Sequence, residues 1–179
     1  MRRRAIVGLM AVVSTSALVV GMSVMPAGAS AHSAKAPVCA GKTKKAATKQ
    51  IKKAYDAFLN GSLGYTAEQK APYIQFLSGD NVNQAFFDQF KASSEANAAS
   101  ASTTSVEVDK VTCAGKKKAD VDFTLVISGS RTEGLAPPGQ AVLEGKSWKV
   151  TALTLCNLQA LGDPSVLENP PCSDFVAAG

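Results

Sequence analysis

The sequence is poor in the residue types that most often carry catalysis and metal binding. It has one histidine, His32, close to the start, and its four cysteines include no C-x-x-C pair. Structural zinc sites use closely spaced cysteine and histidine ligands, so none is predicted here. Because histidine is also the commonest general acid and base, its absence from the rest of the chain argues against that chemistry. We therefore expect no metal, no cofactor and no enzymatic activity.

Arginine is absent between Arg4 and Arg131, although the chain carries a formal charge of +5. Nucleic-acid-binding surfaces usually combine arginines with exposed aromatic side chains, and we find no such combination. Two Gly-Lys dipeptides, at Gly41 and Gly115, look like the end of a phosphate-binding loop, but neither has the required glycine five residues earlier. We therefore expect neither nucleic acid nor a nucleotide as a partner.

Residues 1–29 have the three parts of an export signal. Arginines come first, an apolar run from Ala5 to Met25 follows, and Ala27 and Ala29 form a small-residue cleavage pattern. A transmembrane anchor is the alternative, because the run approaches the roughly 20 residues that span a bilayer. Serine and threonine within the run favour a cleaved signal. We expect a secreted or cell-envelope-associated protein with no membrane span after cleavage.

Cleavage after residue 29 would leave 150 residues, a length typical of one domain. The charges divide unevenly, because residues 30–53 hold seven lysines and no acid, whereas residues 54–179 hold nine basic and fourteen acidic residues. The uneven charge indicates a basic arm on an acidic body. We predict a disordered basic lead-in over residues 30–42, one domain over 43–161 and an irregular tail over 162–179.

Helical periodicity dominates the first half of the predicted domain. Apolar residues recur every three or four positions from Ala47 to Leu59, which predicts an amphipathic helix over residues 43–59. A capping-box sequence at residues 66–69 predicts a short helix that Pro72 bends or splits. A third helix, capped by Asp80, should follow. The side chains that it should direct toward the core are those of Val82, Phe86, Phe87 and Phe90.

The apolar period changes to two in the second half, which is typical of strands. Residues 92–105 are small and polar and predict a loop before this change. Helices followed by antiparallel strands predict an α+β fold, with three helical segments packed on one curved sheet. We expect four strands, at residues 106–113 with a bulge near Asp109, and at residues 119–127, 140–144 and 148–155.

The order of these elements is similar to the cystatin-like cone of nuclear-transport-factor-2-like proteins. The stretch LEGKSWKVTALTLC, residues 143–156, looks like the last hairpin of that fold. Together with AYDAFLNGSLGYTAEQKAPYIQ, residues 54–75, and the export signal, it makes residues 46–161 resemble the C-terminal domain of the mycobacterial low-molecular-weight secreted antigen family. The resemblance implies export and a cone fold. It implies no reaction, because that family is known chiefly as secreted antigens without an assigned chemistry.

Four cysteines in an exported protein predict two disulfides. Two of them open similar stretches, CAGKTKK at Cys39 and CAGKKKA at Cys113. Cys113 should lie beside the turn at Gly145, where the last strand starts, so Cys156 should lie at the opposite edge. That separation exceeds the roughly 7 Å between Cα atoms that a disulfide can bridge. Because Cys156 can instead reach Cys172 in the tail, we predict the pairs Cys39–Cys113 and Cys156–Cys172.

Two surfaces are candidates for function. A pocket inside the cone could bind a small apolar ligand or a lipid, although aromatic residues at such positions more often fill a core. The candidate pocket residues are Tyr55, Phe86, Phe90, Phe123 and Trp148. The lysine-rich side of the first helix could contact an anionic component of the cell envelope, at about 1 kcal/mol for each well-placed lysine. The candidate contact residues are Lys45, Lys49, Lys52 and Lys53.

An enzyme of the same fold with an unrecognised site is the third alternative. Asp120 and Asp122 lie two residues apart, so their carboxylates share one side of a predicted strand. Paired carboxylates can carry out acid–base chemistry. However, this is the polar side of an alternating strand, which predicts two solvated carboxylates and no active site.

Overall fold

The structure is a computed structural model that describes residues 35–79, 82–135 and 137–177. The predicted signal peptide, residues 1–29, and residues 30–34 of the predicted lead-in lie outside the described residues. A 3₁₀ turn, η1 (Gly41–Thr43), precedes the first helix.

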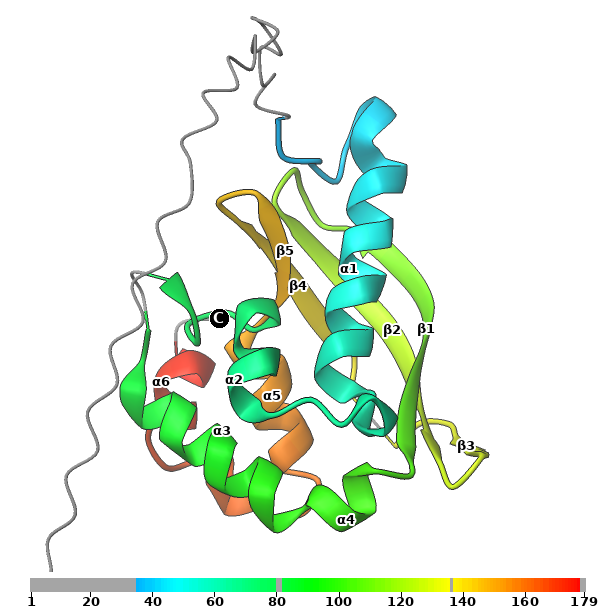
Figure 1. The fold of residues 1–179 in the computed structure, drawn as a ribbon. Coiled ribbons are helices and arrows are strands. Elements are labelled where there is room, and N and C mark those ends of the chain that lie inside the picture. Colours follow the sequence, from blue (N-terminus) through cyan, green and yellow to red (C-terminus); the bar gives the residue numbers. More distant parts are fainter. Residues whose placement is uncertain (1–34, 80–81, 136, 178–179) are drawn as a thin grey trace, which may run out of the picture. The chain divides into compact units, whose positions relative to one another are not determined.

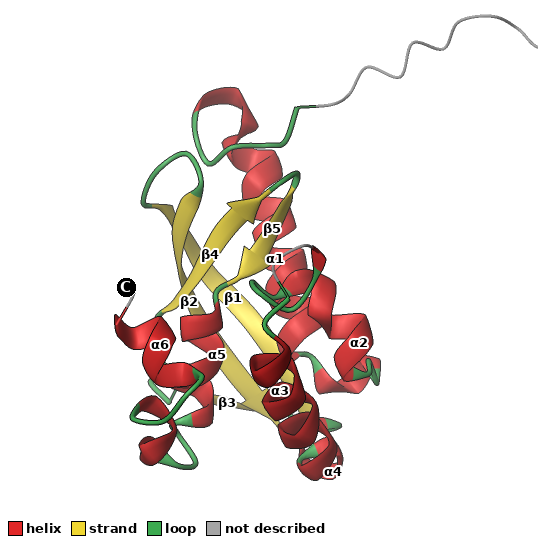
Figure 2. Ribbon diagram, turned by 90° about the vertical axis from the view of Figure 1, so that its left-hand side faces the viewer, coloured by secondary structure: helices red, strands yellow, loops and turns green. Residues whose placement is uncertain are grey.

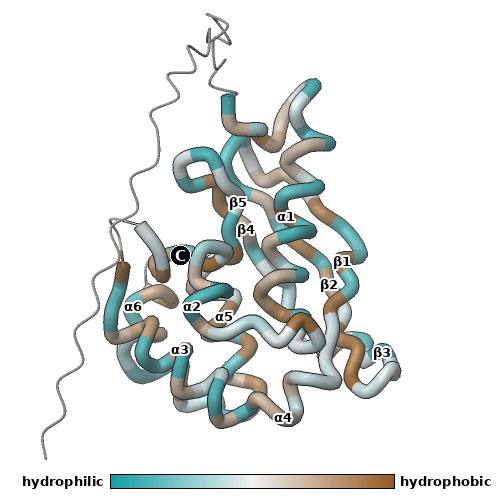
Figure 3. The backbone as a smooth tube through the Cα atoms, viewed as in Figure 1, coloured by the Kyte–Doolittle hydropathy of each residue, from teal (hydrophilic) through white to brown (hydrophobic). Residues whose placement is uncertain are grey.

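Helix α1 (Lys44–Leu59) packs against the sheet through an amphipathic face (Figure 1). Its bounds agree with the predicted helix to within one residue. The change of hydropathy along α1 is visible in Figure 3, where hydrophilic and hydrophobic residues alternate with the helical turn. The side chains buried against the sheet are Ala47, Ile51, Ala54, Tyr55, Ala57 and Phe58.

The predicted capping box is present at helix α2 (Ala67–Lys70), which follows the 3₁₀ turn η2 (Gly61–Leu63). Gln69 N donates to Thr66 Oγ1 at 3.3 Å, and Thr66 N donates to Gln69 Oε1 at 2.9 Å. The chain then enters η3 (Ala71–Tyr73), with Pro72 in its first turn. Proline is tolerated at that position, because a first-turn N–H has no partner within the helix. The predicted split at Pro72 is therefore confirmed.

Helix α3 (Gln84–Ala96) and helix α4 (Ala98–Ala101) occupy most of the segment that was predicted to be a loop. That prediction is wrong because alanine, which is abundant over residues 92–105, has the highest helix propensity. A partly exposed helix needs no continuous apolar face. A segment of small side chains that lacks such a face can therefore still be helical.

Helix α3 is capped by Asn83, whose Oδ1 accepts a hydrogen bond of 3.0 Å from Phe86 N. Phe86 and Phe90 are buried and Phe87 is partly buried, as their spacing predicts. Val82 is exposed, so its predicted place in the core is wrong. It precedes the cap and therefore does not follow the helical period of α3.

The sheet has the strand order β1-β2-β4-β5, with β3 paired to β2, and every pairing is antiparallel. The register shifts between Val108 and Lys110, which confirms the predicted bulge. Helices on a strongly curved antiparallel sheet confirm the predicted α+β class (Figure 2). The strands are β1 (Thr104–Cys113), β2 (Lys118–Ile127), β3 (Ser130–Thr132), β4 (Gly139–Glu144) and β5 (Ser147–Val150).

Strand β5 ends at Val150, and helix α5 (Ala152–Gln159) follows at once, so the prediction of a strand to residue 155 is wrong. Thr151 caps the helix, because its Oγ1 accepts a hydrogen bond of 3.3 Å from Thr154 N. A short apolar run fits a buried helix as well as a buried strand. The threonine cap was the local signal that distinguishes them.

The C-terminal segment also differs from the irregular tail that was predicted. It contains the 3₁₀ turn η5 (Pro164–Leu167) and helix α6 (Cys172–Ala177). Phe175 of α6 packs on Phe76 and Phe86, with ring centroids 5.4 Å and 4.9 Å away. This segment therefore joins the hydrophobic core, which the lack of periodicity did not indicate.

Both predicted disulfides, Cys39–Cys113 and Cys156–Cys172, are formed, each with 5.6 Å between its Cα atoms. Cys39 N also donates a 3.0 Å hydrogen bond to Lys116 O in the β1–β2 turn. The pairing is confirmed although one premise failed, because Cys156 lies on α5 and not at the end of a strand. Cys156 lies away from the turn beside Cys113 whether it ends a strand, as predicted, or lies on α5, as observed.

Candidate functional site: a cavity at one end of the sheet

The five aromatic residues predicted to line a pocket are all buried, with 0–8% of each side chain exposed. Tyr55 packs on Phe123 with ring centroids 5.3 Å apart. Trp148 Nε1 donates a 2.8 Å hydrogen bond to Pro37 O, and neither residue lines the cavity of about 750 Å³ described below. Only Phe90 lines that cavity. Phe86, like the other three, fills the core.

Tyr55 has the features of a structural residue. Its hydroxyl donates a 3.1 Å hydrogen bond to Gln140 O, and burial raises the pKa of that hydroxyl well above its usual range. A Cβ on Gly139 would lie 2.3 Å from the Tyr55 hydroxyl oxygen and 2.9 Å from the Phe123 ring. The tyrosine therefore stays protonated and closely packed, which does not suit a general base.

A cavity of about 750 Å³ lies where β1 begins and β2 ends. Helices α3, α4 and α5 gather at this end of the sheet, as Figures 1 and 2 show. The end of α1, η2 and η5 complete the walls. The main apolar wall is formed by Phe58, Phe90, Leu125, Leu155, Leu158 and Val166.

The rim of the cavity carries large apolar side chains that are open to solvent. Tyr65, Ile127 and Leu161 line it and are 40%, 39% and 46% exposed, respectively. Leu63, in η2, is 41% exposed and lies two residues from Tyr65 in the chain. Exposed apolar side chains are normal when scattered, but a group around a hollow marks a binding site.

The wall between η2 and α4 depends on a glycine. A Cβ on Gly61 would lie 1.8 Å from Ala101 O, which is closer than any side chain can approach. Glycine at this position lets the two backbones meet. The contact closes the side of the cavity next to the end of α1.

Polar side chains also line this largely apolar space, including those of Lys70, Gln89 and Asp163. Lys70 is half-buried, and burial lowers the pKa of its ammonium group. Gln89 Oε1 is buried and has no hydrogen-bond partner among the described residues. Asp163 Oδ1 accepts hydrogen bonds from Ser165 N at 3.0 Å and Ser165 Oγ at 2.7 Å, so it serves as a cap of η5.

A smaller cavity, of about 520 Å³, lies near α6. Phe76, Phe175 and Leu153 form its apolar part, and Asp120 contributes a carboxylate. Asp122, which was considered with Asp120 as a carboxylate pair, does not line this cavity. The structure therefore does not bring the two together in a hollow.

The lysines predicted as an anionic contact differ in their surroundings. Lys45 and Lys49 are exposed on α1. Lys52 Nζ donates a 2.9 Å hydrogen bond to Val108 O, and Lys53 Nζ lies 5.9 Å from the centre of the Tyr73 ring. Two of the four therefore have contacts within the protein.

A larger group of lysines forms at the end of the sheet opposite the cavity. The Cys39–Cys113 disulfide joins the segment before α1 to the β1–β2 turn, and Cys39 N donates a 3.0 Å hydrogen bond to Lys116 O in that turn. The two Cys-Ala-Gly-Lys stretches are thus adjacent. We call this surface the basic end; its members are the exposed residues Lys42, Lys44, Lys45, Lys116, Lys117 and Lys118.

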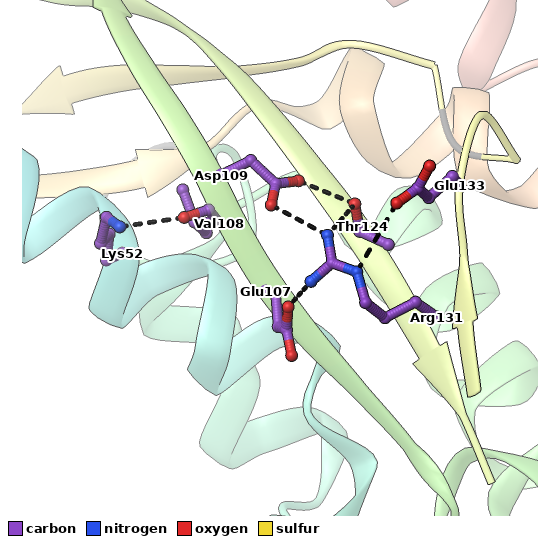
Figure 4. A network of polar contacts seen from close by, with 7 residues as sticks. All are labelled: Lys52, Glu107, Val108, Asp109, Thr124, Arg131 and Glu133. Atoms are coloured by element: carbon purple, nitrogen blue, oxygen red, sulfur yellow. Dashed lines mark hydrogen bonds and ion pairs between the residues drawn. The ribbon is translucent and has the colours of Figure 1, made fainter. Parts of the chain in front are cut away.

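Arg131 of β3 holds a polar network on the sheet (Figure 4). It forms ion pairs with Glu107, with Asp109 at 3.3 Å and with Glu133 at 3.8 Å. Thr124 Oγ1 donates to Asp109 Oδ2 at 2.7 Å. These carboxylates are paired within the protein, so the network fastens β3 beside β1 and β2.

Two kinds of site are absent from residues 35–79, 82–135 and 137–177. No group of three or more His, Cys, Asp and Glu side chains there could hold a metal ion. None of the helices in this part of the chain has the length and hydropathy to cross a membrane.

A family model described as the C-terminal domain of the low molecular weight antigen MTB12 matches residues 44–165. This range is more than half of the chain and includes α1, the sheet and α5. The chain belongs to the MTB12 family. The resemblance inferred from the sequence is thereby confirmed, and most of the cavity wall lies within the family domain.

Comparison with solved structures finds a Campylobacter jejuni protein assigned to the NTF2-like transpeptidases. It is 13% identical, and the match covers 62% of this chain and 98% of the other, with a TM-score of 0.35. Similarity at this level says nothing about activity. No curated protein matches the chain.

Sequence reasoning missed Lys70 and Gln89 as candidate binding residues. Each lies on a short or partly polar helix, where a polar residue is expected to face solvent. The signal available in the sequence was their position beside residues that face the core. Gln89 is adjacent to the buried Phe90, and Lys70 is adjacent to the buried Ala71. That signal is weak without the position of α5, which forms the opposite wall.

Proposed function

We propose that the protein is an exported, non-catalytic binding protein that takes up an apolar ligand, such as a lipid chain, in the cavity beside α5. The observation that supports this most is a hollow of about 750 Å³ with exposed apolar side chains around its rim. Ligand sites are typically clefts of roughly 300–1,000 Å³ with apolar walls and a few polar groups. The cavity has this size and composition.

The disulfides support the export part of the proposal. Four cysteines form two disulfides, and disulfides persist mainly in oxidising compartments outside the cytosol. The family to which the chain belongs is described as an antigen family. The export signal expected over residues 1–29 agrees with both.

Native mass spectrometry and ligand binding together test the proposal. Protein exported by a host cell should carry a co-purifying lipid, and the protein after lipid removal should bind a fluorescent fatty-acid probe. Ser94→Phe places a ring in the cavity, because Ser94 lines it. Ala92→Phe is the matched control, since Ala92 lies on the same helix, is exposed and does not line the cavity.

We expect the probe to bind the wild type and Ala92→Phe alike, and to bind Ser94→Phe at least about tenfold more weakly. Equal binding by all three proteins would place the ligand elsewhere. Failure of the lipid-free wild type to bind any apolar probe would overturn the proposal.

A second candidate function is contact with an anionic component of the cell envelope. The basic end favours it, because the Cys39–Cys113 disulfide and the hydrogen bond from Cys39 N to Lys116 O bring lysines from separate segments together. Exposed lysines attract anionic surfaces by about 1 kcal/mol each, and salt weakens this attraction.

Sedimentation with cell-envelope preparations at increasing salt concentration tests this function. Replacing Lys116, Lys117 and Lys118 together with glutamine should abolish salt-sensitive retention. Replacing Lys52 and Lys53 with glutamine is the control, because both side chains already have partners within the protein. Unchanged retention of the triple variant would exclude the basic end.

A further inference from the structure

Lys70 is an unusual member of the cavity wall. Most of the wall is apolar, yet this ammonium lies among its side chains and is half-buried. The nearest acid on the same helix, Glu68, is paired with Lys91 at 2.7 Å. The hydrogen bond from Lys91 lowers the pKa of Glu68 to about 2, so this carboxylate is ionised and already has its partner.

The ammonium group of Lys70 has no hydrogen-bond or ion-pair partner among the described residues. An ammonium that has lost part of its hydration and has no counter-ion is a site for an anion. The burial that lowers the pKa of Lys70 shows that hydration has been lost. Binding of an anionic group would replace that hydration.

Gln89 supplies a second polar group in the same space. Its Oε1 is buried and has no donor among the described residues, and a buried acceptor without a donor is destabilising. Gln89 lies on α3, and the Glu68–Lys91 ion pair joins α2 to α3. Each member of that ion pair is two residues from Lys70 or Gln89, so both candidate residues belong to the joined part of the two helices.

The remaining charged group of the wall limits where an anion can lie. Asp163 is at the start of η5, on the segment that follows α5. Its carboxylate would repel an anion, whereas Lys70 would attract one. An anionic group is therefore favoured at the α2–α3 side of the cavity, with its apolar part directed along Phe90, Leu125 and Leu158.

We propose that the ligand of this cavity is an amphiphile whose head carries an anion and a hydroxyl group, with the anion bound by Lys70 and the hydroxyl donating to Gln89 Oε1. This inference rests on the proposed function. It adds the chemical class of the head group and the orientation of the ligand. A ligand without a polar head group would leave both polar side chains without partners.

Three ligands of equal chain length test the assignment: dodecanoic acid, its methyl ester and 3-hydroxydodecanoic acid. Their dissociation constants are measured by displacement of a fluorescent probe from the lipid-free protein at pH 7. We expect the acid to bind about tenfold more tightly than the ester, because a hydrogen bond to a charged group is stronger than one to a neutral group. The hydroxy acid should bind roughly threefold more tightly than the plain acid.

The variants separate the two contacts. Lys70→Met should bind the acid and the ester with equal affinity, and its loss of affinity should be larger for the acid than for the ester. Gln89→Leu should remove the advantage of the hydroxy acid over the plain acid. Lys49→Gln is the control, because Lys49 is an exposed lysine that does not line the cavity.

Charge reversal makes the test independent of any loss of affinity. Lys70→Glu should bind dodecylamine more tightly than dodecanoic acid, which is the reverse of the wild-type order. Thermal unfolding of each variant shows whether it is folded.

Each of these results leads to one conclusion. Equal binding of acid and ester by the wild type, or the same preference in wild type, Lys70→Met and Lys70→Glu, overturns the head-group assignment while the cavity remains a lipid site. Binding of none of the ligands overturns the proposed function and this inference with it.

Discussion

The two ends of the sheet are built in different ways. At the basic end, the Cys39–Cys113 disulfide joins segments 74 residues apart, and the lysines around it remain in water. At the cavity end, Cys156–Cys172 joins segments 16 residues apart, and helices enclose an apolar space. The basic end is held together by a long-range covalent bond and two turns. The cavity end is held by close packing of short helices.

The contrast between the two ends indicates which kind of binding each can support. The basic end offers charge without a hollow, which suits a surface contact that depends on salt. The cavity end offers a hollow with few charges, which suits a ligand that leaves water. The four predictions below compare the two ends, in order of decreasing expected effect.

The largest effect should follow removal of the Cys39–Cys113 disulfide. The double variant Cys39→Ala, Cys113→Ala should lose about 4–5 kcal/mol of unfolding free energy, because the closed loop is long. Urea denaturation measures this loss. Salt-sensitive envelope retention should fall as well, since the two lysine segments separate. A loss that is smaller than that of the other disulfide would contradict the chain-entropy argument.

Removal of the second disulfide should have a smaller effect on stability and a different effect on function. Cys156→Ala with Cys172→Ala should lose about 3 kcal/mol, because its loop is short. The variant should weaken apolar-probe binding, since α5 forms a wall of the cavity, and leave envelope retention unchanged. Unchanged probe binding in a destabilised but folded variant would show that α6 does not support the cavity.

Two glycine substitutions compare packing at the two ends. Gly61→Ala should lose about 1–3 kcal/mol, because its Cβ would meet the backbone of Ala101. Gly115→Ala, in the β1–β2 turn, should be nearly neutral, since nothing lies within 4 Å of its Cβ. Thermal unfolding measures both. Equal losses would show that the close approach of η2 and α4 is not maintained in solution.

The smallest expected effect is a change in unfolding free energy when Lys70 is replaced. Lys70→Met should raise the unfolding free energy at pH 7 by about 0.5 kcal/mol, whereas Lys117→Met at the basic end should change nothing. Burial lowers the folded-state pKa of Lys70 below its ordinary value of 10.5. The wild type should therefore gain stability relative to the variant as pH rises from the lowered pKa to about 10.5. A constant difference between pH 7 and pH 11 would contradict this.

Much of the fold was predictable because its signals are local. The stripe of α1, the capping box at Thr66 and the alternation of β2 each lie within one element. Elements without a strong period were missed. The α3–α4 segment is rich in small residues, and α5 follows a strand so closely that its apolar run was assigned to that strand.

The candidate site was less predictable than the fold. Aromatic residues were the natural choice for a pocket, but Tyr55 and Phe123 pack on each other and Trp148 bonds to Pro37. Whether a large side chain fills a core or lines a hollow depends on the volume left between elements. A single element does not contain that information.

The periods of α1 and β2, the expectation of export and the pairing of the four cysteines could be predicted from the order of residues alone. These follow from spacing along one chain and from the order of its hairpins. That Lys70 and Gln89 line one cavity could be found only in the folded protein, because α2, α3 and α5 meet around it. The cysteine pairing already indicated that the two Cys-Ala-Gly-Lys stretches meet, and the fold shows which exposed lysines gather there.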